Sequence, residues 1–187
     1  HGRGIAPAVL GLPIRGAELR QPDLADRLLA EAGAAGADPS GLMVLVWAED
    51  VVGLSDLAVQ RTLRRLGAAG MRIGLDGLDR VGAVPLPGTL APGAPDCLCL
   101  PAAALGGASD EIGRAVAALA RAFELPLVAT GVMDGDIAAL LQRHGAALGA
   151  GPAFGEALTG AGIADLLSER QTVPLAPRRG ARWRRAG

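Results

Sequence analysis

The chain has 187 residues, of which half are apolar and 20% charged, with a formal net charge of −1. This length and composition suit one globular domain with a substantial core. All 18 basic residues are arginine, and lysine, asparagine and tyrosine are absent. The sequence therefore excludes Schiff-base chemistry, a P-loop lysine, lysine or tyrosine acid–base catalysis, and an asparagine metal ligand.

The apolar stretches are all far shorter than the roughly 20 residues that a membrane helix needs. The first residues also lack the apolar core of a signal peptide. We therefore expect a soluble, cytoplasmic protein without a membrane span.

Short apolar runs alternate with longer amphipathic segments, which is the pattern of a βα repeat. The runs are almost wholly apolar, as is typical of parallel strands that are covered on both faces. The predicted strands are Ala8–Leu12, Met43–Trp47, Arg72–Leu75, Cys97–Leu100, Leu127–Ala129 and Ala146–Gly149. The predicted helices are Pro22–Ala35, Ser55–Ala69, Ser109–Phe123, Gly135–His144 and a last one near Ile163–Glu169.

The ends of these helices carry recognisable signals. Pro22 suits a first helical turn, and Ser55 and Ser109 suit N-caps. Gly70 and Gly145 stand where helices are expected to stop. His144, directly before Gly145, is expected to serve the helix end rather than catalysis.

Two segments break the alternation. Between Asp76 and Asp96 the chain is rich in glycine and proline, so we expect an irregular loop there. Residues 174–187 contain five arginines around Trp183 and no acidic residue from Arg178 onward, which predicts a tail. Clustered arginines beside an aromatic ring suit nucleic acid or anionic lipid, but without these five the rest of the chain carries about −6 and offers no broad basic face. We therefore expect a solvated or partner-binding tail and no nucleic-acid partner.

Cys97 and Cys99 lie two residues apart in a predicted strand, where their geometry is poor for bridging each other. We expect them to be reduced core thiols. The sequence has only two histidines, His1 and His144, so zinc-ligand spacing is missing and no structural metal is expected.

Alternating βα units imply a parallel sheet, which is either open and doubly wound or part of a (βα)₈ barrel. Composition leaves both open, but no G-x-G-x-x-G motif follows the early strands.

Six segments, in order, resemble motifs of the EAL domain family of cyclic di-GMP phosphodiesterases. The family motifs are V-N-I-S-x-x-Q-L, L-x-L-E-I-T-E-S, L-x-x-x-G-x-x-I-A-L-D-D, the strand with K-I-D, V-V-A-E-G-V-E-T and G-x-x-x-x-Q-G-Y-x-x-G. The matching segments here are Leu12–Leu19, Leu42–Asp50, Leu66–Gly77, Cys97–Pro101, Leu127–Asp134 and His144–Gly155.

The resemblance implies an α/β fold, a partial or modified (βα)₈ TIM-type barrel of about six βα units. Residues 1–173 would form an EAL-like domain that lacks the first strand and helix of the family, with residues 174–187 as the tail. An incomplete barrel leaves an open sheet edge, which another protein or an upstream domain would cover.

Family members hydrolyse a phosphodiester with two divalent metals held by oxygen ligands. The resemblance carries this site onto the sequence residue by residue, and only Asp76 keeps a ligand, while Glu49 matches the second acid of L-E-I-T-E. The other matched positions carry Pro13 for the asparagine, Val46 for the strand glutamate, Gly77 for the second aspartate, Cys99 and Pro101 for the lysine and aspartate of K-I-D, Thr130 and Met133 for two glutamates, and Ala150 for the glutamine.

These replacements predict a catalytically inactive EAL-like domain that acts as a protein interaction, scaffolding or regulatory module in bacterial signalling. No catalytic residue, metal ligand set or cofactor is expected. A non-catalytic cyclic di-GMP receptor is the alternative, with Arg15, Asp76 and Arg80 as weak ligand candidates. A phosphodiesterase completed by a missing N-terminal segment is a remote third reading.

Asp76 and Asp79 could form a pair of carboxylates for acid–base catalysis, but they share one loop and no third catalytic group accompanies them. The family dimerises through the region that follows D-D, which is altered here, so the oligomeric state stays open.

Overall fold

The computed structural model describes residues 9–51, 56–78, 95–104, 110–163 and 165. Six parallel strands form one sheet whose spatial order follows the sequence, β1-β2-β3-β4-β5-β6. A doubly wound sheet reverses its strand order at a switch point, and this sheet does not. The sheet is therefore of the barrel type, as the resemblance implied. The strands are β1 (Leu10–Ile14), β2 (Leu42–Trp47), β3 (Arg72–Asp76), β4 (Cys97–Pro101), β5 (Leu127–Thr130) and β6 (Ala146–Gly149).

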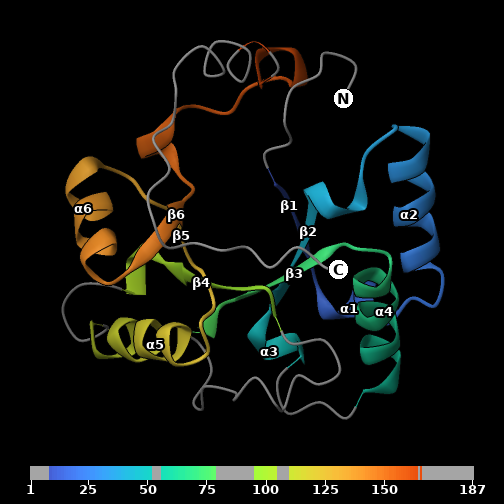
Figure 1. Ribbon diagram of the computed structural model, residues 1–187, viewed down its shortest axis with the longest axis horizontal. Coiled ribbons are helices and arrows are strands. Elements are labelled where there is room, and N and C mark those ends of the chain that lie inside the picture. Colours follow the sequence, from blue (N-terminus) through green and yellow to red (C-terminus); the bar gives the residue numbers. More distant parts are fainter. Residues whose placement is uncertain (1–8, 52–55, 79–94, 105–109, 164, 166–187) are drawn as a thin grey trace.

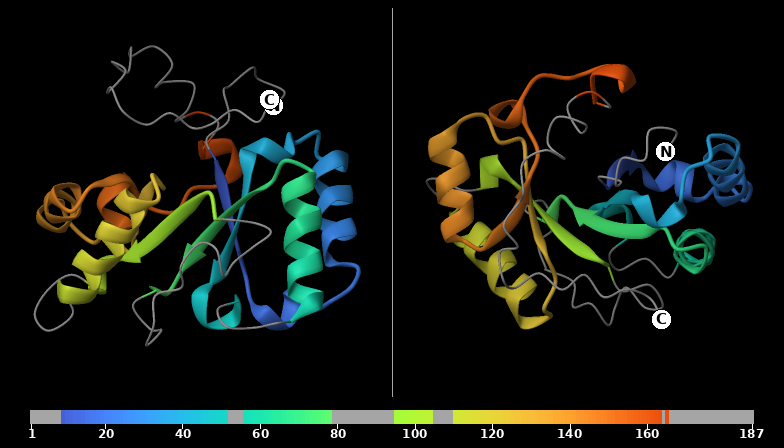
Figure 2. Two further views of the ribbon diagram at one scale, coloured as in Figure 1. Left: turned by 60° about the horizontal axis from the view of Figure 1, so that its bottom comes forward. Right: turned by 45° about the horizontal axis from the view of Figure 1, so that its top comes forward.

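The helices cover the convex side of this curled sheet. Figure 1 shows α2 and α4 beside the first three strands and α5 and α6 beside the last three, and Figure 2 shows the curl from two further sides. The helices are α1 (Gly16–Leu19), α2 (Leu24–Ala34), α3 (Ala48–Val51), α4 (Leu57–Ala68), α5 (Asp110–Ala122) and α6 (Gly135–Arg143), with 3-10 turns η1 (Pro39–Gly41), η4 (Ala102–Ala104) and η6 (Pro152–Phe154). The fold is thus a six-stranded part of a (βα)₈ barrel.

The six predicted strands and the first four predicted helices are confirmed, with boundary corrections. The first strand begins at Leu10 rather than Ala8 and runs to Ile14. The N-cap of α4 is Asp56, whose carboxylate accepts the N–H groups of Ala58 and Val59. Pro22 precedes the helix, which begins at Leu24 after the N-cap Asp23.

The glycines that follow two of the helices stand where they were expected. Gly70 and Gly145 adopt φ values of +92° and +96°, in the left-handed region that ends helices. Two short helices, α1 and α3, were missed because four residues are too few to show a 3.6-residue period.

Some predictions lie wholly or largely outside the described residues. These are Ser55, Ser109, residues 79–94 of the glycine- and proline-rich loop, and the tail 174–187. Of the last predicted helix, residues 160–163 and 165 are helical, so this helix begins before Ile163. No helix in the described part of the chain is long and apolar enough to cross a membrane.

The main core lies between the convex side of the sheet and the helices. It joins strand residues such as Val46, Leu75 and Leu98 to helix residues such as Leu66 and Val116, all at most 2% exposed. These side chains alternate along the strands with residues that face the concave side.

A second, smaller cluster lies on the concave side. It consists of Met43, Cys97, Cys99 and Val128, with half-buried Leu45 packed against it. Both cysteines are free thiols and fully buried, as predicted.

Candidate functional site

The candidate site lies at the carboxyl ends of β1, β2 and β3 on the concave side, where barrel enzymes carry their active sites. The strand register pairs Ile14 with Val46 and Trp47 with Asp76. Arg15, which follows β1 directly, is thereby brought beside the end of β2. The helix α3, which follows β2 without a gap, adds Glu49 and Asp50.

Arg15 is held by three partners at this edge. Its guanidinium lies 4.9 Å from the centroid of the Trp47 ring, and its Nη2 donates to Glu49 Oε1 at 2.8 Å. Its Nε lies 3.2 Å from Asp50 Oδ2. The hydrogen bond to Glu49 raises the pKa of Arg15 further, so the guanidinium stays charged. Arg15 was predicted as a candidate phosphate ligand, and the structure shows it exposed and paired with Glu49 and Asp50 of the same chain.

Glycine makes room for part of this cluster. A Cβ at Gly16 would lie 2.9 Å from Cβ of Asp50, so a larger residue would push the carboxylate away from Arg15. The Arg15 backbone N–H donates to Glu18 Oε2 at 2.9 Å, which fixes the start of α1. The arginine is thus positioned by backbone and side-chain contacts together.

Asp76 ends β3 and is half-buried. Its Oδ1 accepts the N–H of Gly77 at 2.7 Å, so part of its hydrogen-bonding capacity is used locally. This edge carries three carboxylates, those of Glu49 and Asp50, which are paired with Arg15, and that of Asp76 at the end of β3. Their excess negative charge disfavours anionic ligands such as phosphates.

The second aspartate of the family motif has no space here. Gly77 stands at that position with φ +70°, and a Cβ on it would lie 2.7 Å from Cε3 of Trp47. A side chain at residue 77 would meet both an unfavourable backbone and the indole ring. Trp47 therefore fills the space beside Asp76.

The strand glutamate of the family maps to a different residue than the sequence indicated. Val46 is 1% exposed in the convex core, so its side chain points away from the concave side. Leu45 lies on the concave side, in register with Pro13 and Gly74. The assignment to Val46 is wrong by one residue because an apolar run offers no polar landmark for its register. Leu45 supplies no oxygen ligand either.

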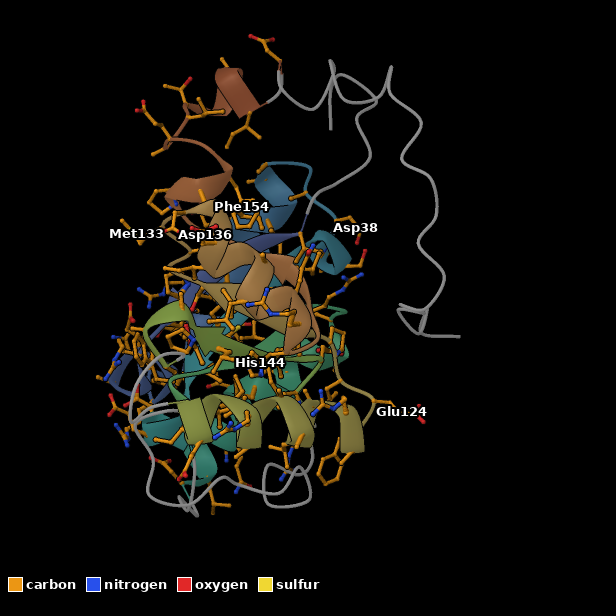
Figure 3. The ribbon with its side chains drawn as sticks, turned by 90° about the vertical axis from the view of Figure 1, so that its left-hand side faces the viewer. Asp38, Glu124, Met133, Asp136, His144 and Phe154 are labelled. Carbon is orange, nitrogen blue, oxygen red and sulfur yellow. The ribbon has the colours of Figure 1, made fainter. Side chains whose placement is uncertain are left out.

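The other matched positions carry neutral side chains. Cys99 is fully buried, and its hydrogen bond with Cys97, followed by burial, raises its pKa far above the ordinary value, so it stays a thiol. Thr130 is half-buried at the end of β5. Met133 is 62% exposed, and Figure 3 shows its side chain at the edge of the molecule. Arg80 and Asp79 lie outside the described residues.

A two-metal hydrolase site would need several hard oxygen ligands at these strand ends. Within the described ranges, no three side chains of His, Cys, Asp or Glu converge to hold a metal ion. Asp76 offers one carboxylate, but Pro13, Leu45 and Gly77 offer no side-chain oxygen and Thr130 only a hydroxyl. These residues do not fit such a pair of ions.

His144 has the expected place at a helix end. It is the C-cap of α6, its N–H donates to the carbonyl of Leu140, and its own carbonyl accepts from Arg121 at 3.4 Å. Sequence reasoning missed Trp47 and Asp50 as partners of Arg15. An aromatic residue at a strand end followed by two acids was the available signal.

A family model described as "EAL domain" matches residues 1–157. The structure is similar to the EAL domain of Mycobacterium smegmatis DcpA (27% identity, TM-score 0.71), covering 90% of this chain and 75% of that one. It is also similar to the PaMucR phosphodiesterase in complex with c-di-GMP (20% identity, TM-score 0.70), covering 82% of this chain and 69% of that one.

Klebsiella pneumoniae BlrP1 in its calcium and c-di-GMP complex is a further similar structure (24% identity, TM-score 0.65), and the match covers 76% of this chain and 37% of that one. The chain thus spans about a third to three quarters of these proteins. A search of curated proteins found no match.

Proposed function

Because the chain belongs to the EAL domain family of cyclic di-GMP signalling, we propose that it is a member without phosphodiesterase activity that serves as an interaction and regulatory module. We assign residues 1–173 to the domain and 174–187 to a tail. The observation that carries this proposal is the set of residues at the carboxyl ends of the strands. There, Asp76 ends β3 beside Trp47, while Pro13 on β1, Leu45 on β2 and Gly77 after β3 carry no oxygen side chain.

An interaction role is supported by the two outer strands of the described sheet. Within the described residues β1 pairs only with β2, and β6 pairs only with β5. Strand edges with unpaired backbone groups are natural places for another polypeptide to add.

Exposed apolar side chains accompany both edges. Leu10 on β1 is 56% exposed, and four large residues around β6 and beyond are between 43% and 53% exposed: Leu148, Phe154, Leu158 and Ile163. A pocket of about 130 Å³, lined by Leu141, Leu148 and Phe154 among others, lies between α6 and the end of the sheet. Such surfaces are typical of interaction sites.

A non-catalytic cyclic di-GMP receptor is the second candidate, favoured by one observation. Arg15 stacked on Trp47 offers a cation and an aromatic face at the mouth of the barrel, and both suit a nucleotide. The carboxylates beside Arg15 argue against this candidate. Arg15 would have to break its hydrogen bond with Glu49 before it could bind a phosphate.

Calorimetric titration with cyclic di-GMP, with and without magnesium or calcium, separates the two candidates. The interaction proposal predicts no heat of binding for the wild-type protein. Binding that is lost in Arg15→Ala but kept in Arg27→Ala, an exposed arginine of α2 in a local ion pair, would establish the receptor instead.

The apolar surface around β6 is tested by changing it directly. Phe154→Ser and Leu148→Ser should abolish capture of a partner found by affinity purification. Leu57→Ser is the matched control, because Leu57 is 72% exposed on α4, away from β6. Equal loss of the partner in all three variants would contradict an interaction through this surface.

A further inference from the structure

Three sulfur-containing side chains from two different strands share the concave side of the sheet. Sγ of Cys97 on β4 lies 3.4 Å from Sδ of Met43 on β2. Cys99, two residues along β4, lies on the same face and belongs to the same buried cluster. Both cysteines are 0% exposed and Met43 is 9% exposed, and neither cysteine is in a disulfide.

Gly74 makes this meeting possible. Strand β3 lies between β2 and β4, and Gly74 is in register with Leu45 on one side and Cys97 on the other. A Cβ on Gly74 would lie 2.7 Å from Cδ2 of Leu45, 3.0 Å from Sγ of Cys97 and 3.2 Å from Sδ of Met43. Glycine thus leaves the space in which the two sulfur atoms approach each other across the intervening strand.

We propose that Met43, Cys97 and Cys99 form a binding site for a soft monovalent cation, Cu(I). Thiolate and thioether sulfurs are the ligands that select Cu(I) over hard cations. Zinc is the poorer match, because it takes four ligands in a tetrahedron and rarely a thioether. The site is separate from the strand-end positions of the family motif, apart from Cys99, and nothing in the proposed interaction role requires it.

The surroundings exclude water from this cluster. Its other members are Val128, which is 9% exposed, and half-buried Leu45. Cysteine binds metal as the thiolate, so the bound cation displaces one or two thiol protons to solvent, and no electron is transferred. One thiolate neutralises the single charge of the cation, and loss of the second proton leaves the site with a net charge of −1.

Packing alone is the competing explanation, since methionine and free cysteine also fill cores as ordinary apolar side chains. The two explanations differ in what Gly74→Ala does. This variant keeps all three sulfur atoms and adds one methyl group between two of them. The added Cβ meets only the far ends of side chains, so the fold can adjust.

The test is an anaerobic titration of the reduced full chain with Ag(I), and with Cu(I) in competition with bicinchoninate. The wild-type chain should bind one equivalent. Cys97→Ser, Cys99→Ser, Met43→Leu and Gly74→Ala should each weaken binding by at least roughly tenfold. Met133→Leu, an exposed methionine outside the cluster, should bind like wild type.

X-ray absorption of the Cu(I) form should show a shell of sulfur only, with one sulfur fewer in Met43→Leu. Thermal melts verify that each variant folds; if the serine variants unfold, Gly74→Ala and Met43→Leu decide. No uptake by the wild-type chain would overturn the proposal. Unchanged affinity in Gly74→Ala and Met43→Leu would do so as well.

Discussion

The two faces of this one sheet are built from different kinds of residue. The convex face carries large aliphatic side chains that pack against α2, α4, α5 and α6. The concave face carries glycine, proline, cysteine and a few apolar residues, with Asp76 as a carboxylate at its edge. In the barrel architecture the first face stabilises the fold and the mouth of the second carries the chemistry.

This difference teaches which changes the fold tolerates. Residues of the convex core have tight neighbours on the helices, so their replacement leaves cavities. Positions at the mouth of the barrel border less protein, so their side chains can change while the fold persists. The chain keeps an EAL fold, and the mouth of its sheet carries Pro13, Leu45 and Gly77 on or beside the first three strands.

The largest effect is expected from a cavity in the convex core. Leu98→Ala should lower the free energy of unfolding by about 2–5 kcal/mol, because the side chain is 1% exposed and fully surrounded. Leu45→Ala, at a half-buried concave position, should cost clearly less. Urea denaturation of both variants measures this, and equal losses would contradict the division between the two faces.

A smaller effect is expected from restoring the second aspartate of the family motif. Gly77→Asp should cost about 1–3 kcal/mol, because the residue has φ +70° and its Cβ meets the Trp47 ring. Combining it with Trp47→Ala should recover the part due to the ring. Additive losses in the double variant would show that the ring does not fill this space.

A buried hydroxyl on the helix side should contribute about 1 kcal/mol. Thr62, which is 6% exposed on α4, donates from Oγ1 to the carbonyl of Leu19 at 2.9 Å. Thr62→Val removes this donor at nearly constant volume, whereas Thr62→Ser keeps it. Thermal unfolding should rank the variants wild type, serine, valine; a valine variant as stable as wild type would refute this contribution.

The smallest effect concerns the N-cap of α4 and its pH dependence. The hydrogen bond from Arg20 is the main cause that lowers the pKa of Asp56 from its ordinary value of 3.8. The ionised form thus contributes stability above that value, which is lost as pH falls through the lowered pKa.

Asp56→Asn keeps a capping side chain but has no charge. Denaturation as a function of pH should show the wild type more stable at neutral pH and the two proteins converging in acid. A constant difference across the range would contradict the role of the charge.

Much of the fold was predictable from the sequence, and the site was predictable only in part. The apolar runs located all six strands because parallel strands buried on both faces have no other pattern. The apolar run of β2 contains no polar residue to show which side chains face the concave side. The sequence therefore indicated Val46 for a concave position that Leu45 occupies. The pairing of Arg15 with Glu49 and Asp50 joins residues more than thirty positions apart, and no local pattern reports such contacts.

The contact between Met43 and Cys97 across Gly74 was likewise not predictable from the sequence, because it depends on which strands are neighbours in the sheet. The place of Asp76 at a strand end was predictable, because the apolar run of the strand stops directly before it.

The most direct test of the account is a phosphodiesterase assay on the purified chain. Cyclic di-GMP would be incubated with the protein in magnesium and in manganese, beside an active EAL domain as control, and linear product separated by chromatography. The account predicts no product above the protein-free reaction. Turnover that disappears in Asp76→Asn would contradict it, and would mean that a mouth with Pro13, Leu45 and Gly77 still hydrolyses the substrate.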